Sequence, residues 1–333
     1  MTARALLYCA GGGIGDSLVA SVVGRALRRH FTTVDALTLA GHRAALERVP
    51  DLDAVLVDDE SDERAFAETV RERGYDACVV TWATPRTARI PWRAGIPIRV
   101  GQARRLYSFR FTDRVVVRSE IGDVTSHWSD ILLDYARAID CDTDDRAYRF
   151  VPTLEDDREA RDLLEARGWN AGNFVILNPC NAVASKRGIW PAGGWARTAR
   201  ALAEHYAMPV LVSGSPADAP IAERIAAEAG DPAASIAGTL GIGAFGALAR
   251  QARAFVGITT GSMHVAAAVG CPTAGIFPFQ SDYPDRWAPL GRHVAIVRPS
   301  YPCHPGDTKE RCRDYACIER LDVERILAAA RTL

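Results

Sequence analysis

The sequence predicts an α/β fold of two domains, each a parallel β-sheet covered by helices. The chain has 333 residues, of which 48% are hydrophobic and 24% charged, which is an ordinary globular composition with enough length for two cores. Short apolar runs alternate with helical stretches in the first half, and the same alternation starts again after Pro152. We therefore expect domains at residues 1–152 and 153–333.

In the first domain, each expected strand is a short run of apolar and β-branched residues. These strands lie at 5–10, 34–40, 54–59, 76–81, 96–101 and 113–118. The expected helices lie at 18–31 and 43–49, in the stretch that ends at Gly74, and at 127–139. This order is the βαβ rhythm of a Rossmann-like domain, because parallel strands need a crossover between them.

The second domain begins with a charged helix at 155–167, which ends at Gly168. Its expected strands lie at 173–179, 208–214, 234–238, 254–260 and 272–277. A last helix near 323–332 is expected to cross back toward the first domain. Two Rossmann-like domains facing a central cleft suit a ligand that lies across the carboxyl ends of both sheets.

Composition excludes several classes of protein. The formal net charge of −1 gives no global attraction for nucleic acid. No stretch has the roughly 18 to 20 apolar residues of a membrane span, and the N-terminus enters a strand-like run without a cleavable signal pattern. Cys9, Cys78 and Cys271 lie in apolar runs, as small buried residues do. We expect a cytoplasmic protein.

A glycine loop at positions 10–20, AGGGIGDSLVA, connects the first strand to a helix. A dinucleotide-binding fingerprint would have its third glycine where this chain has Asp16. A carboxylate there repels a pyrophosphate, while the helix dipole stabilises its charge. We expect Asp16 to act as a base, with Gly13 and Gly15 leaving room for an acceptor; the alternative is a helix-capping aspartate.

Two further strand-to-helix connections in the second half are candidates for anion binding. Lys186 and Arg187 stand in the loop after 173–179, where a diphosphate would need cations, although a solvated surface loop has the same composition. After 254–260, a turn offers backbone N–H groups at a helix start, formed by Thr260, Gly261, Ser262, Met263 and His264. The small residues of that helix also suit close packing on the sheet.

Asp218 lies at another strand-to-helix turn of this half. A carboxylate there can bind ribose hydroxyls, or it can serve only as an acid at a helix N-terminus. The three turns should meet at one edge of the sheet, and this convergence favours a ligand site.

With these motifs in hand, the chain resembles the lipopolysaccharide heptosyltransferases of glycosyltransferase family 9, which have the GT-B fold. The similar segments are GGGIGDSLVAS, IPIRVG, HWSDILLDYARAI, SKRGIWPAGGWARTARAL, GSPADAPIAERIA and TTGSMHVAAAVGCPTAGIF. The resemblance implies a catalytic aspartate at Asp16, a donor-binding lysine at Lys186, a ribose-side acid at Asp218 and a donor-diphosphate turn at 260–264. It also implies an acceptor-side arginine at Arg99.

The chain departs from the family pattern at two places. Thr259 stands where the family usually has aspartate before the Thr-Gly pair, and Gly188 and Ile189 are extra residues in the Lys-Arg-Trp-Pro segment. Both changes fit nucleotide-sugar chemistry, and they do not single out ADP-heptose as the donor.

The predicted function is therefore inverting, metal-independent transfer of a sugar from a nucleotide diphosphate, such as ADP-heptose, to a glycan, glycolipid or small-molecule acceptor. No cofactor is expected, and Thr259 and Thr260 would add hydroxyl groups around the leaving diphosphate. The alternatives are a nucleotide-sugar epimerase, a non-catalytic nucleotide-sugar-binding protein and, third, an NAD-dependent dehydrogenase.

Two other clusters carry further predictions. The stretch from Arg86 to Arg118 holds nine arginines and the single acid Asp113, a basic field that predicts peripheral contact with an anionic inner-membrane surface or, alternatively, solvated loops. Near the C-terminus, Cys303, His304, Cys312 and Cys317 could close a zinc site, but their spacing matches no known finger signature.

Overall fold

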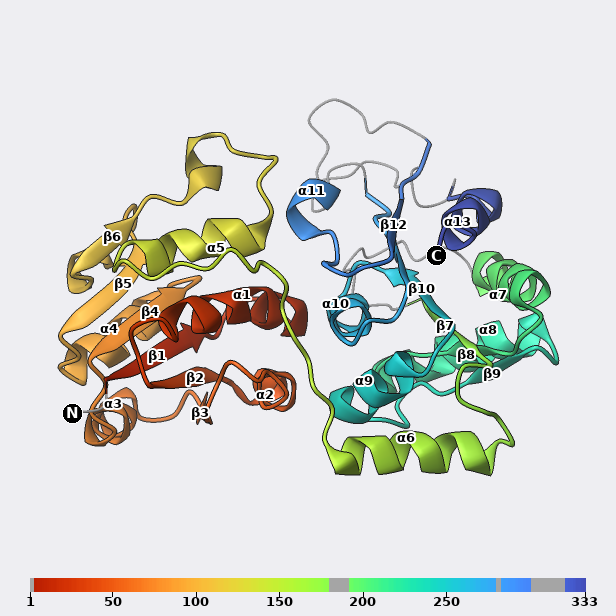
Figure 1. Cartoon of the computed structure of the whole chain (residues 1–333), viewed down its shortest axis with the longest axis horizontal. Coiled ribbons are helices and arrows are strands. Elements are labelled where there is room, and N and C mark those ends of the chain that lie inside the picture. The colour runs from red at the N-terminus through yellow and green to blue at the C-terminus, as the bar shows by residue number, and fades with distance from the viewer. Residues whose placement is uncertain (1–2, 180–191, 280–282, 301–320) are drawn as a thin grey trace. The chain divides into compact units, whose positions relative to one another are not determined.

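The structure, a computed structural model, describes residues 3–179, 192–279, 283–300 and 321–333 (Figure 1). The chain divides into two compact units, Met1–Val151 and Pro152–Leu333. Each unit contains a six-stranded sheet in which all recorded strand pairs are parallel. The predicted α/β class, with a parallel sheet in each half, is confirmed.

The first sheet has the strand order β3-β2-β1-β4-β5-β6. Its strands are β1 (Arg4–Cys9), β2 (Thr33–Leu39), β3 (Val55–Asp58), β4 (Ala77–Thr81), β5 (Ile98–Gln102) and β6 (Asp113–Val115). The central strands β1 and β4 are almost fully buried, since helices cover both faces of the sheet.

The helices of this unit are α1 (Ile14–Leu27), α2 (Ala40–Leu46), α3 (Glu63–Glu72), α4 (Pro85–Arg93) and α5 (Trp128–Arg137), with short 3-10 turns η1 (Ser108–Arg110) and η2 (Arg118–Ile121). The helix α1 packs against α2 and α5, and α3 packs against α4. Figure 1 shows α5 lying along α1. One core cluster contains Leu6, Tyr8, Leu37, Val70 and Val80.

The second sheet has the order β12-β11-β10-β7-β8-β9. Its strands are β7 (Val175–Asn178), β8 (Val210–Val212), β9 (Ala233–Ser235), β10 (Ala254–Ile258), β11 (Thr273–Ile276) and β12 (Val294–Val297). Two strands of this sheet, β7 and β10, lie at its centre as β1 and β4 do in the first.

The helices of the second unit are α6 (Leu154–Ala166), α7 (Ala192–Tyr206), α8 (Ala219–Ala229), α9 (Ile242–Arg250), α10 (Gly261–Ala268), α11 (Pro284–Trp287) and α13 (Val323–Ala330), with a 3-10 turn η3 (Pro216–Asp218). The helix α7 packs against α8 and α13, and α9 packs against α6 and α10. The last helix, α13, also contacts β11 and β12 of its own unit.

Three helices of the first unit differ from the sequence prediction, and one of them, α2, spans Ala40–Leu46 where 43–49 is expected. The helix α1 begins at Ile14 rather than at residue 18, because Gly13 acts as its N-cap and the Asp16 side chain accepts a hydrogen bond from the Gly13 N–H. The helix α4 was not predicted, and it contains Pro91. Pro85 in its first turn and the capping hydroxyl of Thr84 stabilise its start.

In both sheets the strand order reverses at one pair of central strands, β1 with β4 and β7 with β10. Ligands of open parallel sheets bind outside the carboxyl ends of the strands at such a switch point. The residues that follow these four strands are therefore the first place to look for a site. Within the described residues, no helix has both the length and the apolar character to span a bilayer.

Candidate functional site

Asp16 lies at the switch point of the first sheet, in the first turn of α1 after β1. The residue is half-buried, and its Oδ2 accepts a hydrogen bond from the Gly13 N–H at 2.7 Å. The helix N-terminus stabilises its negative charge. The carboxylate therefore contacts the N-cap residue of its own helix, which was the alternative to a catalytic role. It also lies at the position where we expect a base.

Side chains of the protein occupy the space where Gly11 and Gly12 would otherwise carry a Cβ atom. Gly12 has a left-handed backbone, with φ of +70°, and a Cβ there would lie 2.3 Å from Cγ of Asp16. A Cβ at Gly11 would lie 2.5 Å from Cβ of Trp82. The exposed Gly13 has only the Asp16 carboxylate near its missing Cβ, at 3.8 Å, and Gly15 is buried. Of these glycines, Gly13 borders the open part of the loop.

A buried histidine lies beside Asp16. His42, on α2, has its Nδ1 atom 3.1 Å from the Oγ atom of Ser17. Burial lowers the pKa of His42, although the nearby Asp16 carboxylate raises it. The lowered pKa favours the neutral imidazole of His42 beside the predicted base. No sequence pattern indicates this pairing, because α2 reaches α1 only through the fold.

Trp82 follows β4 directly and was also missed by sequence reasoning. Its backbone is left-handed, with φ of +49°, which costs a bulky residue on the order of 1–3 kcal/mol. Trp82 is half-buried, and its ring centroid lies 6.1 Å from that of Trp128, the first residue of α5, with the ring planes 43° apart. A tryptophan directly after the apolar run 76–81 was the available signal.

At the switch point of the second sheet, Thr259 and Thr260 connect β10 to α10. The Thr260 hydroxyl does not cap the helix; it donates to the Ile258 carbonyl at 3.2 Å and lies 2.9 Å from the Ser262 hydroxyl. The N–H groups of Met263 and His264 donate to the Thr260 carbonyl. The N–H groups of Gly261 and Ser262 are the ones that such a helix start offers to a ligand.

Two members of this turn are buried. Met263 packs against β11, since a Cβ at Gly275 would lie 2.7 Å from its sulfur atom. His264 is also buried. Thr259, Thr260, Gly261 and Ser262 are half-buried and follow the carboxyl end of β10 in sequence order.

Asp218 is buried, and its carboxylate contacts the start of its own turn. Its Oδ2 accepts hydrogen bonds from the N–H of Ser215 at 2.8 Å and from the Ser215 hydroxyl at 2.6 Å. These contacts are those of an acid that closes a helix start, the alternative that the sequence left open.

Several predicted residues lie outside the described part of the chain. They are Lys186, Arg187, Cys303, His304, Cys312 and Cys317. Within residues 3–179, 192–279, 283–300 and 321–333, no group of three or more His, Cys, Asp or Glu side chains is arranged to hold a metal ion. Cys9, Cys78 and Cys271 are buried, as expected.

Arg99 is not brought to the edge where Asp16 lies. It is the second residue of β5, and its guanidinium donates to the carbonyls of Ile96, Pro97 and Arg110. The predicted acceptor-side arginine thus binds the loops that enter β5 and β6.

Much of the predicted basic field is neutralised by ion pairs. Arg86 binds Asp58, both Arg89 and Arg93 bind Glu63, and Arg105 binds Glu120. A further member, Arg118, binds acids of α5 and of the loop that precedes it. The partner acids lie outside the arginine stretch in the sequence, so local composition overstated its charge.

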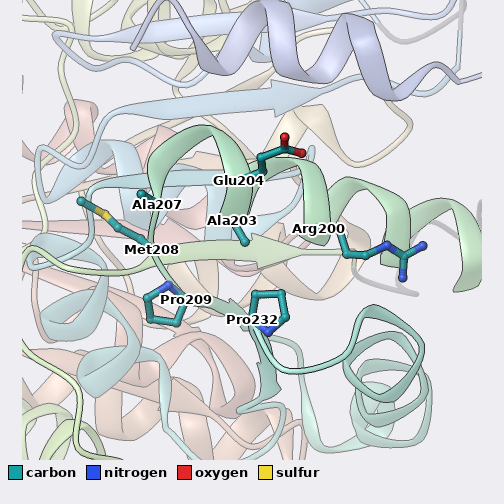
Figure 2. Close-up of a pocket in the computed structure, with 7 residues that line it drawn as sticks. All are labelled: Arg200, Ala203, Glu204, Ala207, Met208, Pro209 and Pro232. Atoms are coloured by element: carbon teal, nitrogen blue, oxygen red, sulfur yellow. The ribbon is translucent and has the colours of Figure 1, made fainter.

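A pocket of about 590 Å³ lies in the second unit, away from its switch point (Figure 2). It is lined by Arg200, Ala203, Glu204, Ala207, Met208, Pro209 and Pro232. Pro209 and Pro232 precede β8 and β9, so the pocket is at the amino ends of these strands, the edge opposite to the start of α10. Its position does not fit a site at the carboxyl edge.

Comparisons with known proteins agree with the sequence motifs. A family model described as glycosyltransferase family 9 (heptosyltransferase) matches residues 63–316. The match spans Lys186, Asp218 and the 259–264 turn, but not the glycine loop with Asp16. A comparison with curated protein sequences gives no match.

Solved structures share the fold along the whole chain. A glycosyl transferase family 9 structure from Veillonella parvula has a TM-score of 0.86 at 16% identity, over 99% of this chain and 96% of that chain. The E. coli ADP-heptose lps heptosyltransferase II has a TM-score of 0.77 at 19% identity, over 98% and 97%. The E. coli heptosyltransferase WaaC with ADP has a TM-score of 0.68 at 16% identity, over 92% and 95%.

These likenesses confirm the fold expected from the resemblance, and the family model covers well over half of the chain. The chain therefore belongs to glycosyltransferase family 9 and is a glycosyltransferase.

Proposed function

We propose that this enzyme moves a heptose-like sugar, with inversion and without a metal ion, from a nucleotide diphosphate such as ADP-heptose to a hydroxyl group of a glycan or glycolipid. The observation that carries the proposal is that Asp16 and the 259–264 turn lie at the switch points of their sheets. Relatives whose structures are named for ADP-heptose or contain ADP support the choice of donor.

In the proposed reaction, Asp16 accepts the proton of the acceptor hydroxyl while that oxygen forms a bond to the anomeric carbon of the donor. The bond from the anomeric carbon to the phosphate oxygen breaks, and its electron pair leaves with the nucleoside diphosphate. The Gly13 N–H fixes Oδ2 of Asp16 and thereby orients the carboxylate before the acceptor arrives.

The second unit would bind the leaving diphosphate. The N–H groups of Gly261 and Ser262 start α10, and the hydroxyls of Thr259 and Thr260 precede them. We propose that Lys186 and Arg187 add positive charge, since they follow β7, the sheet neighbour of β10. Fixed dipoles and cations of this kind stabilise a developing diphosphate charge.

The substitution Asp16→Asn tests the base, because the asparagine oxygen can still accept the Gly13 hydrogen bond. Removal of a positioned base should lower kcat by about 10² to 10⁴, while the thermal shift caused by ADP stays unchanged. Asp62, which caps α3 in the same unit through Arg64 and Ala65 N–H groups, is the matched control. Turnover of Asp16→Asn within a few-fold of wild type would remove the base from the proposal.

Lysine modification tests the donor site, because Lys186 and Lys309 are the only lysines in the sequence. Reductive methylation followed by peptide mass spectrometry should show that ADP protects Lys186 and leaves Lys309 unchanged. Lys186→Ala should also weaken ADP binding. Equal modification of Lys186 with and without ADP, together with unchanged ADP affinity in Lys186→Ala, would exclude this lysine from the site.

For a glycolipid acceptor, we propose that the first unit meets the membrane through apolar side chains near η1. Leu106 is 98% exposed, and the exposed rings of Trp92 and Phe109 flank the Arg110 guanidinium at 5.5 and 4.3 Å. Such aromatic, apolar and basic groups together suit an anionic lipid surface.

Vesicle sedimentation tests this contact. Phosphatidylcholine vesicles that contain phosphatidylglycerol should carry the wild-type protein down, and Leu106→Asp should weaken this binding. The control is Leu154→Asp, at an exposed leucine of the second unit. Sedimentation that ignores both phosphatidylglycerol and the Leu106 substitution would argue against membrane contact.

A further inference from the structure

We infer that Trp82 and Trp128 form the surface on which a sugar ring of the acceptor lies, next to Asp16. The inference rests on the proposed function and adds to it the residues that contact the sugar ring of the acceptor. The position comes from the sheet: β4, which ends just before Trp82, is the neighbour of β1, which ends just before the glycine loop.

The Trp82 side chain is next to the loop that carries Asp16. A Cβ at Gly11 would lie 2.5 Å from Cβ and 3.2 Å from Cγ of Trp82, so only glycine at position 11 lets the tryptophan come this close. The Cβ and Cγ atoms of Trp82 therefore lie against the glycine loop.

The residues after Trp82 hold its unusual backbone in place. The Ala83 carbonyl accepts a hydrogen bond from the Tyr107 hydroxyl. The Thr84 N–H donates to the Thr87 hydroxyl at 2.8 Å, and the Thr84 hydroxyl accepts from the Thr87 N–H at 3.2 Å. A tryptophan that is fixed in a left-handed conformation at a ligand-binding edge fits a role in function better than a role in packing alone.

The two indoles present a shaped apolar surface. Their centroids are 6.1 Å apart, their planes are tilted by 43°, and both residues are half-buried rather than fully buried. The face of an aromatic ring carries partial negative charge, whereas the C–H bonds on one face of a pyranose carry partial positive charge. A sugar ring can therefore stack here while its hydroxyl groups point toward the polar edge with Asp16.

The charge of the surroundings favours a neutral ring over a phosphate. Asp16 is a carboxylate in the adjoining first turn of α1, and Arg86, in the first turn of α4, is already paired with Asp58 at 2.6 Å. A diphosphate would be repelled by Asp16 and would lack a cation from this arginine.

Saturation-transfer NMR with methyl glycosides as probes tests the inference without knowledge of the natural acceptor. In the wild-type protein, protons on one face of the pyranose should receive most saturation. Trp82→Leu should lower this signal about threefold to tenfold, the range expected for loss of an aromatic contact, and Trp82→Phe should retain part of it. Trp169→Leu, at a tryptophan of the second unit that contacts Arg167, is the control and should keep the signal.

The ADP-induced thermal shift, measured on every variant, separates this inference from the proposed function and reports folding. A pyranose signal that is lost only in Trp82→Leu, with the ADP shift intact, supports the platform. An ADP shift with a pyranose signal that is absent in the wild type or equal in Trp82→Leu would overturn the platform and leave the donor proposal standing. Loss of the ADP shift in the wild type would instead overturn the proposed donor.

Discussion

The substitution Gly12→Ala should damage both the stability of the first unit and catalysis. The new Cβ would lie 2.3 Å from Cγ and 2.4 Å from Oδ2 of Asp16, so the carboxylate has to move. The left-handed φ of +70° adds about 1–2 kcal/mol of strain. Loss of the hydrogen bond between Gly13 and the charged Asp16 adds about 1.5 kcal/mol, the low end for a half-exposed charged group.

The expected sum is about 3 kcal/mol, which corresponds to a fall in Tm of roughly 6–12 °C for a unit of this size. Two glycines of the same unit separate the causes. Gly122 has φ of +96°, and no atom lies within 4 Å of the place that an added methyl group would take, so Gly122→Ala measures left-handed strain alone. Gly41, in α2, has neither strain nor a close atom, and Gly41→Ala should leave stability equal or raise it by up to about 1 kcal/mol.

Thermal unfolding by circular dichroism and acceptor-dependent release of ADP are measured on all three variants. Turnover should fall in Gly12→Ala only, because only this substitution displaces the Asp16 carboxylate. If Gly12→Ala and Gly122→Ala have the same Tm and both keep full turnover, the reasoning about the glycine loop is refuted.

Three further predictions concern the buried groups and the reaction. Arg86→Leu removes the partner of Asp58, whose side chain is 1% exposed, and should lower the unfolding free energy in urea by about 3 kcal/mol; a loss below about 1 kcal/mol would contradict a tight pair. Burial raises the pKa of Asp58, but hydrogen bonds from Arg86 and Tyr8 outweigh burial and hold the pKa below its usual range. The ionised Asp58 therefore stabilises the folded protein at pH values above the pKa that Asp58 has in the unfolded chain. This contribution is lost as the pH falls through the pKa of Asp58 in the folded protein. Unfolding free energy should therefore fall more steeply with acid in the wild type than in Arg86→Leu. Burial raises the pKa of Cys9 and of Cys271 to about 12, so iodoacetamide should label neither in the folded protein at about pH 8, and rapid labelling in peptide mass spectra would contradict their burial. Turnover should be unchanged by a chelator, and activity that is lost with EDTA and restored by Mg²⁺ would contradict metal-independent transfer.

Most strands of the parallel sheets were predictable from the sequence, because each is a short apolar run that periodicity detects. The strand β12 at the edge of the second sheet was not predicted. The predicted strands at 5–10, 76–81 and 254–260 overlap β1, β4 and β10. The start of α1 was less visible, since the Gly13 and Asp16 contact that begins this helix occurs in a stretch that reads as a glycine turn.

Contacts between distant residues were not predictable from one sequence. The arginines of 86–118 look like a basic field, yet Arg86 and Arg89 bind acids that lie 28 and 26 residues away. His42 contacts Ser17 from another helix. The close approach of Trp82 to the first strand-to-helix loop requires glycine at position 11. Composition counts charges and aromatic rings, whereas their partners depend on how the strands are ordered in the sheet.

The order of strands in each sheet also has a consequence for synthesis on the ribosome. The strand β1 is made first but needs β4 beside it, and the first sheet is complete only when β6, Asp113–Val115, has emerged. The second sheet repeats this delay, since β7 waits for β10. Each nascent sheet therefore exposes unpaired central strands for a time, and early folding of the first unit protects the chain from pairing strands of one sheet with those of the other.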